Sequence, residues 1–303
     1  MKSIQIQLTG KCNQLCYMCG QHDWVEKPNL SLDKVLEYIN KYPNCTFTFT
    51  GGDPLSWNIN NYEDMKKLTD YLVENKINYQ IFTNLYFNLN EAQLYFLRNA
   101  EVVQISFDGS TYKRYKYIRG VGNKKGYDNL ISNIKLLTNY TDIKLNCTVS
   151  LRNFDDVYNI LNIAKELKVK IRFFPVHTKD NIMLNDKMFK SIKKQFEEFK
   201  LKNIDFVKDK TNIESFEFES RKPFNGKCYV KNEHLVIMAD GLEYPCCRAT
   251  NDNGENWNGK YNIQNLDNLD DPDTLYEFCS NCDRYRKFND NWDEYKNKEK
   301  VYL

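Results

Sequence analysis

Residues 8–20 read LTGKCNQLCYMCG, and this stretch decides how the rest of the chain is interpreted. Its cysteines, Cys12, Cys16 and Cys19, are spaced C-x3-C-x2-C. A structural zinc site takes four protein ligands, so zinc would need a more distant donor such as His22. Three close thiolates instead suit a 4Fe–4S cube whose remaining iron is open to a non-protein ligand. The spacing therefore favours an iron–sulfur cluster, with zinc as the alternative.

Strand-like and helix-like segments alternate six times around this stretch. The helical segments carry apolar residues at three- and four-residue spacing, and the first begins at Ser31, a suitable N-cap. The strand-like segments are rich in β-branched and aromatic residues and cover 3–9, 45–50, 79–84, 102–108, 143–150 and 170–176. This order predicts parallel strands joined by crossover helices, in a barrel or an open α/β sheet.

One face of these predicted strands is polar, although buried parallel strands are usually apolar on both faces. The polar rows are Gln5, Gln7 and Thr9; Thr46, Thr48 and Thr50; Gln104, Ser106 and Asp108; and Asn146, Thr148 and Ser150. We expect these rows to line a wet, ligand-holding barrel interior. The alternative is an ordinary barrel in which a few polar residues are satisfied.

Composition narrows the function classes. The 303 residues include 43 Lys and Arg against 41 Asp and Glu, and this balance argues against a nucleic-acid partner bound through bulk charge. No apolar run is long enough for a membrane span, and residues 1–10 lack a signal-peptide core, so we predict a cytoplasmic protein without a membrane partner. In a reducing compartment the ten cysteines are not expected to form disulfides, and the clustered ones are expected to be metal ligands or catalytic groups. Cys45 and Cys147 lie on apolar strand faces and are expected to be core residues.

A C-x3-C-x2-C loop after the first strand of a six-fold βα chain resembles the radical SAM superfamily. The resemblance implies that the open iron chelates the amino and carboxylate groups of S-adenosylmethionine (SAM). It also implies that the reduced cluster cleaves SAM to a 5′-deoxyadenosyl radical, which takes hydrogen from the substrate. A reductant such as flavodoxin or ferredoxin is the expected electron donor.

Further motifs follow the family pattern at the ends of predicted strands. They are TGGDP (50–54), FTNL (82–85), SFDG (106–109) and YIRGVG (117–122). The resemblance implies SAM contacts by Met18, Gly51, Gly52, Asp53, Pro54, Asn84, Ser106, Asp108 and Arg119.

Some of these positions depart from the family pattern. Asp53 replaces a more usual Glu, and Leu85 replaces a Gly. Met18 stands where many relatives place an aromatic residue beside adenine. Arg119, by contrast, follows the family pattern, and the resemblance implies that it pairs with the SAM carboxylate.

The βα rhythm stops after residue 205. Residues 234–247 read as a β-hairpin with Asp240 and Gly241 at the turn. Four cysteines around it, Cys228, Cys246, Cys279 and Cys282, resemble the short twitch form of the SPASM extension, which implies one auxiliary 4Fe–4S cluster. A structural zinc ribbon is the alternative.

Cys247 is the extra thiol beside Cys246. It is a weak catalytic candidate as a hydrogen-atom donor and could also be a spare ligand. We favour an inert role, because adjacent strand residues point to opposite faces.

The predicted fold is α/β: a partial (β/α)6 TIM-like barrel followed by a small, cysteine-rich twitch module containing a β-hairpin. The predicted boundaries are 1–205 for the radical SAM core, 206–285 for the linker and auxiliary module, and 286–303 for a polar tail.

Three functions remain open at this point. The first is hydrogen abstraction from a small polar, carbohydrate- or aminocyclitol-like substrate, assisted by the auxiliary cluster. The second is maturation of a ribosomally made peptide by crosslinking, epimerisation or side-chain oxidation. The third is a non-catalytic metal-binding protein.

Overall fold

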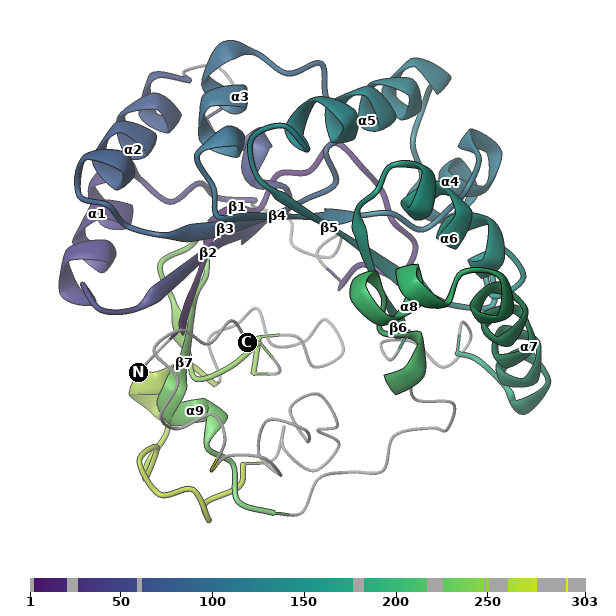
Figure 1. Cartoon of the computed structure of the whole chain (residues 1–303). Helices are drawn as coiled ribbons and strands as arrows, with labels where there is room; N and C mark the ends of the chain where they lie inside the picture. Colours follow the sequence, from purple (N-terminus) through teal and green to yellow (C-terminus); the bar gives the residue numbers. More distant parts are fainter. Residues whose placement is uncertain are drawn as a thin grey trace. The chain divides into compact units, whose positions relative to one another are not determined.

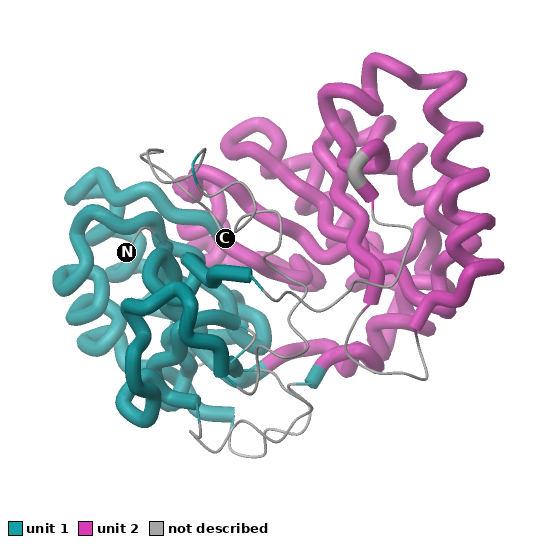
Figure 2. Tube along the Cα trace, turned by 90° about the horizontal axis from the view of Figure 1, so that it is seen from below, with its two compact units in different colours: residues 1–11, 20–80, 221–303 teal, residues 12–19, 81–220 magenta. Residues whose placement is uncertain are grey.

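The computed structural model describes residues 3–20, 27–58, 62–176, 183–216, 226–247, 249–250, 261–276 and 293 (Figure 1). The chain forms two compact units (Figure 2). Unit 1 contains residues 1–11, 20–80 and 221–303, and unit 2 contains residues 12–19 and 81–220. The boundary at residues 80 and 81 falls within strand β3 (Tyr79–Thr83).

Unit 1 is built around parallel strands. In chain order its elements are β1 (Ser3–Thr9), α1 (Leu32–Lys41), β2 (Thr46–Gly51), the 3₁₀ helix η2 (Pro54–Ser56), α2 (Glu63–Glu74), α9 (Val230–Glu233), β7 (His234–Ile237), β8 (Glu243–Tyr244) and the 3₁₀ helix η6 (Ile263–Asn265). Strand β1 pairs in parallel with both β2 and β7. As predicted, Ser31 caps α1, and its side chain accepts a hydrogen bond from the backbone N–H of Lys34.

The hairpin predicted near residue 240 is confirmed, because β8 runs antiparallel to β7. Gly241 at the turn has φ of 85°, a left-handed conformation that suits glycine. The parallel pairing of β7 with β1 was not foreseen. The βα rhythm of the sequence stops after residue 205, well before β7, so the alternation of elements gives no sign that this late strand joins β1.

Unit 2 alternates helices with parallel strands. Its elements are α3 (Glu91–Arg98), β4 (Val102–Ser106), α4 (Tyr112–Arg119), α5 (Lys124–Leu137), β5 (Asp142–Val149), α6 (Val157–Glu166), β6 (Lys170–Pro175), α7 (Asp186–Lys202), α8 (Ile204–Lys210) and the 3₁₀ helix η4 (Ile213–Ser215). Strand β5 lies between β4 and β6 and is parallel to both. The predicted strands all appear, but the connection from β4 to β5 contains two helices where the sequence indicated one.

The predicted division of each strand into an apolar and a polar face is present. The apolar residues of β1, β2, β4 and β5 are fully buried: Ile4, Ile6, Leu8, Phe47, Phe49, Val103, Ile105, Leu145, Cys147 and Val149. The polar rows bond across neighbouring strands. The Asn146 side-chain amide donates to the Gln104 side-chain oxygen at 2.9 Å, and Gln80 donates in the same way to Thr48 at 2.8 Å.

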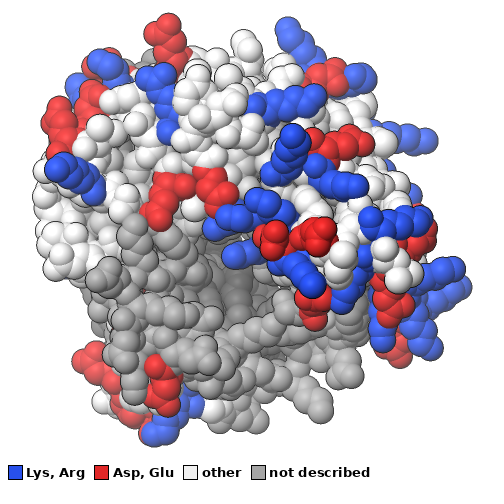
Figure 3. All heavy atoms as spheres, viewed as in Figure 1, with Lys and Arg blue, Asp and Glu red and all other residues white. Residues whose placement is uncertain are grey.

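Charge on the described surface is mixed. On the face drawn in Figure 3, cationic and anionic side chains are interspersed. Among the described residues, no helix combines the length and apolar character that crossing a membrane requires.

The free edge of β6 is closed by the segment that follows α8. Ile171 forms a parallel bridge with Thr211. The Asn212 side chain accepts a hydrogen bond from the Phe173 N–H at 2.8 Å and donates one to the Phe173 carbonyl at 2.9 Å. Pro175 has no N–H to offer. This edge therefore presents little backbone for pairing with another strand.

We expect Asn212→Ala to lower the free energy of unfolding by about 1–3 kcal/mol, because both polar groups of the Phe173 backbone lose their partner. Urea unfolding measures the change. The matched control is Asn139→Ala, which removes an exposed amide that donates only to the Leu136 carbonyl. A loss no larger than that of the control would contradict the role given to Asn212.

Candidate active site

The cysteine loop, residues 12–19, is held by the end of helix α4. The Leu15 N–H donates to the Arg119 carbonyl at 3.1 Å, and the Tyr17 N–H donates to the Ile118 carbonyl at 3.3 Å. Carbonyls in the last turn of a helix have no partner inside the helix. Here the loop supplies one, so α4 fixes the loop through backbone atoms.

Gly120 makes this contact possible. It ends α4 with φ of 61°, and its N–H donates to the Lys116 carbonyl. A Cβ atom at this position would overlap the carbonyl oxygen of Leu15. Both the left-handed conformation and the close approach of the loop therefore require glycine. From the sequence alone, no role was predicted for Gly120, which was noted only as part of the YIRGVG segment.

Two side chains of unit 2 donate hydrogen bonds to the cysteine sulfurs. Arg119 Nη1 lies 3.4 Å from Cys16 Sγ, and Asn84 Nδ2 lies 3.6 Å from Cys12 Sγ. Cys16 is buried. Donors aimed at sulfur stabilise thiolates and cluster sulfur, which carry negative charge.

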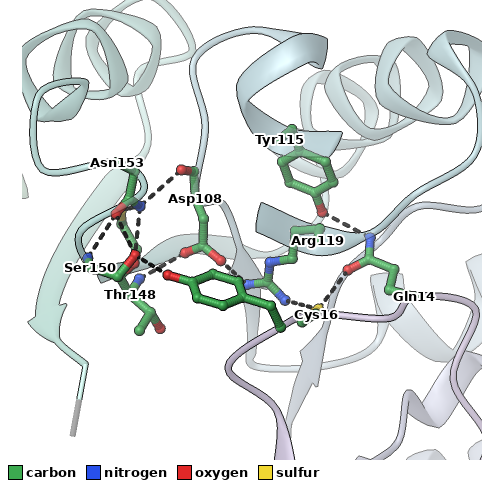
Figure 4. A network of polar contacts seen from close by, with 10 residues as sticks. Gln14, Cys16, Asp108, Tyr115, Arg119, Thr148, Ser150 and Asn153 are labelled. Atoms are coloured by element: carbon green, nitrogen blue, oxygen red, sulfur yellow. Dashed lines mark hydrogen bonds and ion pairs between the residues drawn. The ribbon is translucent and has the colours of Figure 1, made fainter. Parts of the chain in front are cut away.

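Arg119 is itself held by Asp108, as Figure 4 shows. Arg119 Nη2 lies 2.5 Å from Asp108 Oδ2, and Asp108 is fully buried. The other oxygen, Oδ1, accepts the Thr148 N–H at 2.7 Å, and Asn153 donates to the Asp108 carbonyl. Both Asp108 and Arg119, predicted as SAM contacts, thus have partners within the protein.

Burial and the ion pair act in opposite directions on these two groups. Burial raises the pKa of Asp108, and the Arg119 charge opposes that rise. Burial lowers the pKa of Arg119, but Asp108 and Cys16 outweigh it and raise this pKa well above its usual value. The guanidinium is therefore permanently charged beside the Cys16 sulfur.

A second set of contacts orients the cysteine loop (Figure 4). Gln14 donates to the Tyr115 hydroxyl at 3.0 Å. The Tyr17 hydroxyl donates to Ser150 Oγ at 2.6 Å, and the Arg152 guanidinium lies 3.7 Å from the centre of the Tyr17 ring. Burial raises the pKa of Tyr17, which keeps its hydroxyl protonated as a donor.

Asn84 and Leu85 form a tight turn after β3. The Asn84 side-chain oxygen accepts the Tyr86 N–H, and its amide also donates to Asn13 in the cysteine loop. Leu85 has φ of 52°, a left-handed conformation that a glycine would adopt freely. The backbone at Leu85 is thus left-handed although Leu stands where the family pattern has Gly.

In unit 1, the TGGDP segment packs against the residues that precede Cys12. The Gly52 N–H donates to the Thr9 carbonyl at 2.6 Å, and the Asp53 N–H donates to the Lys11 carbonyl at 2.8 Å. A Cβ at Gly51 would overlap the Thr9 carbonyl oxygen, and one at Gly52 would overlap that of Lys11. These glycines allow two backbone segments to meet, a role that the predicted SAM contact did not include.

Asp53 and Pro54 begin the 3₁₀ helix η2. The buried Asp53 side chain accepts the Leu55 N–H at 3.0 Å and so caps the helix, and Pro54 is its first residue. Ser106 ends β4, where it is partly exposed, and Met18 lies in the turn at residues 17 and 18, also partly exposed. The predicted SAM contacts of these four residues remain predictions.

Three of the C-terminal cysteines lie around one apolar cluster of unit 1. Cys246 belongs to its buried core, while Cys228 and Cys247 are partly buried and pack against it. The Cys228 N–H donates to the Pro272 carbonyl at 2.8 Å. Cys279 and Cys282 fall outside the described residues. The proposed auxiliary ligand set is thus seen only in part.

The remaining two cysteines have structural positions. Cys147 is fully buried on the apolar face of β5, and burial raises its pKa well above the usual value. Cys45 precedes β2 and is half-buried, so it is less enclosed than the predicted core position.

The residues of the cysteine loop fit a 4Fe–4S cluster. The donor set is three thiols, two of which already have N–H donors aimed at their sulfurs. The described residues contain no group of three or more His, Cys, Asp or Glu side chains arranged to hold one metal ion. A cube needs a wider arrangement than a single ion does, because each thiolate binds a different iron.

We expect Gly120→Ala to loosen the cysteine loop, because a left-handed alanine costs about 1–2 kcal/mol and its Cβ displaces Leu15. The melting temperature and the iron retained after anaerobic reconstitution should both fall. The control is Gly122→Ala, since a Cβ at Gly122 meets no atom within 4 Å. Equal iron content in the two variants would show that α4 does not position the loop.

Comparisons with known proteins agree on the family. The family model described as the radical SAM superfamily matches residues 6–185. A cysteine-type anaerobic sulfatase-maturating enzyme from Clostridium novyi (strain NT) is 25% identical over 279 residues, which cover 81% of this chain and 74% of that protein.

Solved structures agree on the fold. The structure of native anSMEcpe with bound AdoMet matches this chain with a TM-score of 0.63 and 18% identity. The match covers 94% of this chain and 88% of the anSMEcpe chain. Streptococcus suis SuiB bound to the precursor peptide SuiA covers 88% of this chain, and this chain spans 63% of SuiB, with a TM-score of 0.65 and 16% identity. The predicted α/β fold, with parallel strands and helices as in a partial barrel, is confirmed. Since the family match covers residues 6–185 of 303, the protein belongs to the radical SAM superfamily of enzymes.

Proposed function

We propose that this enzyme is a maturase that modifies a side chain of a peptide or protein substrate. The relationship to the sulfatase-maturating enzyme carries the proposal, because the alignment extends over 74% of that protein. Two similar structures are complexes with peptides: anSMEcpe with the Cp18Cys peptide, and SuiB with the precursor peptide SuiA. These relatives favour the peptide interpretation over a carbohydrate-like substrate. Membership of an enzyme superfamily argues against the non-catalytic metal-binding protein.

The cluster and SAM, when bound, supply one-electron chemistry that ends in removal of a hydrogen atom from the substrate. Cys12, Cys16 and Cys19 would hold the cluster. Arg119 would orient Cys16 and keep a positive charge beside its sulfur. Asn84 would orient Cys12 through a neutral hydrogen bond to its sulfur. Hydrogen bonds to sulfur stabilise the more negative, reduced cluster and so raise its reduction potential.

Substrate class is tested by incubating the reconstituted enzyme with SAM and dithionite. One set of reactions receives cysteine-containing peptides, and a second receives aminocyclitols and simple sugars. We expect a mass change in a peptide, with 5′-deoxyadenosine formed in proportion. A product from the sugar set alone would overturn the peptide proposal.

Two substitutions of Asp53 distinguish its predicted role in SAM binding from its role in the stability of the protein. Asp53→Asn keeps the oxygen that accepts the Leu55 N–H and removes the charge, whereas Asp53→Ala removes both. We expect both variants to bind SAM more weakly in equilibrium dialysis. Only Asp53→Ala should also lose about 1 kcal/mol of stability, because it loses the helix cap. Unchanged SAM affinity in Asp53→Asn would remove Asp53 from the SAM site.

We also propose that residues 206–285 form a module with one auxiliary 4Fe–4S cluster, held by Cys228, Cys246, Cys279 and Cys282. The shared apolar cluster around Cys228 and Cys246 supports it. Four thiolates leave no open iron, so this cluster would accept an electron from the substrate rather than bind the substrate. Cys247 would be an inert neighbour.

Iron content tests the second cluster. Replacing Cys279 and Cys282 together with Ala should remove about half of the iron, and so should replacing Cys12, Cys16 and Cys19. Circular dichroism checks that each variant is folded. A folded variant that lacks Cys279 and Cys282 but keeps all its iron would exclude the auxiliary cluster.

A further inference from the structure

The strands β4, β5 and β6 present a row of polar and charged side chains on the face opposite their apolar core. Register places Lys144 beside Lys170, Asn146 beside Arg172, and Thr148 beside Phe174. The alternate residues of β5 and β6 are buried, whereas this row is partly or fully exposed. Arg172 is exposed in the middle of the row. All these residues belong to unit 2.

Positive charge on this face is only partly neutralised. Asp142 lies 2.9 Å from the Lys170 ammonium and 3.8 Å from that of Lys144, so one carboxylate serves two lysines. Within the described residues, no carboxylate forms an ion pair with Arg172. Burial lowers the pKa of Lys144, and repulsion from Arg172 lowers it further against the weaker effects of Asp142 and Glu101. The positive charge of Arg172 therefore contributes to the lowered pKa of Lys144 on the neighbouring strand.

A second, independent feature lies beside Arg172. The side-chain oxygen of Asn146 is buried and has no hydrogen-bond partner, while its amide donates to Gln104. A buried acceptor without a donor costs stability unless a ligand completes it. A backbone N–H of a peptide is a donor of the right kind.

The edge of β6 does not provide a competing site. Thr211 and the Asn212 side chain already occupy its backbone groups at Ile171 and Phe173. Addition of a peptide as a further strand at this edge is therefore disfavoured. Recognition on unit 2 is left to the side chains of the face.

We infer that Arg172, with Lys144 and Asn146, binds an acidic residue of the peptide substrate. The Arg172 guanidinium would pair with the carboxylate through two parallel N–H bonds, a geometry that lysine does not offer. Lys144 would add charge, and Asn146 would accept a backbone N–H of the same segment. This inference rests on the proposed function, since it names the chemistry of that substrate.

The test measures binding of three fluorescein-labelled twelve-residue peptides to the full-length, reconstituted enzyme at low salt. The peptides alternate Gly with Glu, Gln or Lys. We expect the Glu peptide to bind at least about tenfold more tightly than the Gln peptide, and Arg172→Gln to remove this preference. Arg98→Gln, which changes an exposed arginine on α3, is the matched control and should keep the preference.

A charge-reversal variant distinguishes loss of the charge contact from general misfolding of the Arg172→Gln variant. Arg172→Glu combined with Lys144→Glu should bind the Lys peptide more tightly than the Glu peptide. A wild-type enzyme that binds the peptides without preference for Glu, or an Arg172→Gln variant that retains the preference, would overturn the inference and leave the peptide maturase proposal standing.

Glutarate separates failure of the site from failure of the proposed function. If no peptide binds but glutarate binds and Arg172→Gln abolishes it, the carboxylate site stands and the peptide proposal falls. If neither peptides nor glutarate bind the wild-type enzyme, the inference is wrong.

Discussion

The contact between the cysteine loop and the end of helix α4 is the constraint on which the candidate site depends. Two backbone hydrogen bonds join residues 15 and 17 to residues 119 and 118. The same helix end supplies Arg119, whose guanidinium reaches Cys16. One helix terminus therefore sets both the path of the loop and the charge beside one of its sulfurs. Gly120 is the residue that permits this approach.

The Asp108–Arg119 pair illustrates how a buried ion pair can serve geometry rather than stability. Removing two charges from water costs several kcal/mol per ion, and the attraction between them offsets this only when the remaining hydrogen bonds are made. Asp108 is fully buried and also accepts the Thr148 N–H. Its function in unit 2 is to hold the Arg119 guanidinium in one orientation, so that the other nitrogen points at sulfur.

Sequence reasoning succeeded where the chemistry is local. The three-cysteine spacing and the alternation of strands and helices each depend on nearby residues, so the family and the α/β fold could be predicted. The polar and apolar faces followed from the two-residue period of a strand, as the buried Leu145, Cys147 and Val149 show.

Other features depend on residues far apart in the sequence and left little trace in it. The β7–β1 pairing joins residues 234–237 to residues 3–6 through backbone atoms alone. The Asn212 side chain bonds to the backbone of Phe173 as a neighbouring strand would. An asparagine in a loop usually has a local role, so the sequence does not reveal this contact. The close approach of Gly51 and Gly52 to the backbone of residues 9–11 was not foreseen, and their predicted SAM contact stays a prediction. The ion pair between Asp108 and Arg119 was likewise not foreseen, and the predicted SAM contacts of both residues stay predictions.

The separation between the cysteine loop and its support has a consequence for biosynthesis. Cys16 and Arg119 are 103 residues apart in the chain. At about 5–20 residues per second, a ribosome completes Arg119 roughly 5–20 s after Cys16. During that interval the thiols are exposed on a nascent chain that lacks α4. Insertion of a cluster into a correctly shaped loop would therefore have to wait for α4, and iron and sulfide delivered within that interval would meet an unformed site.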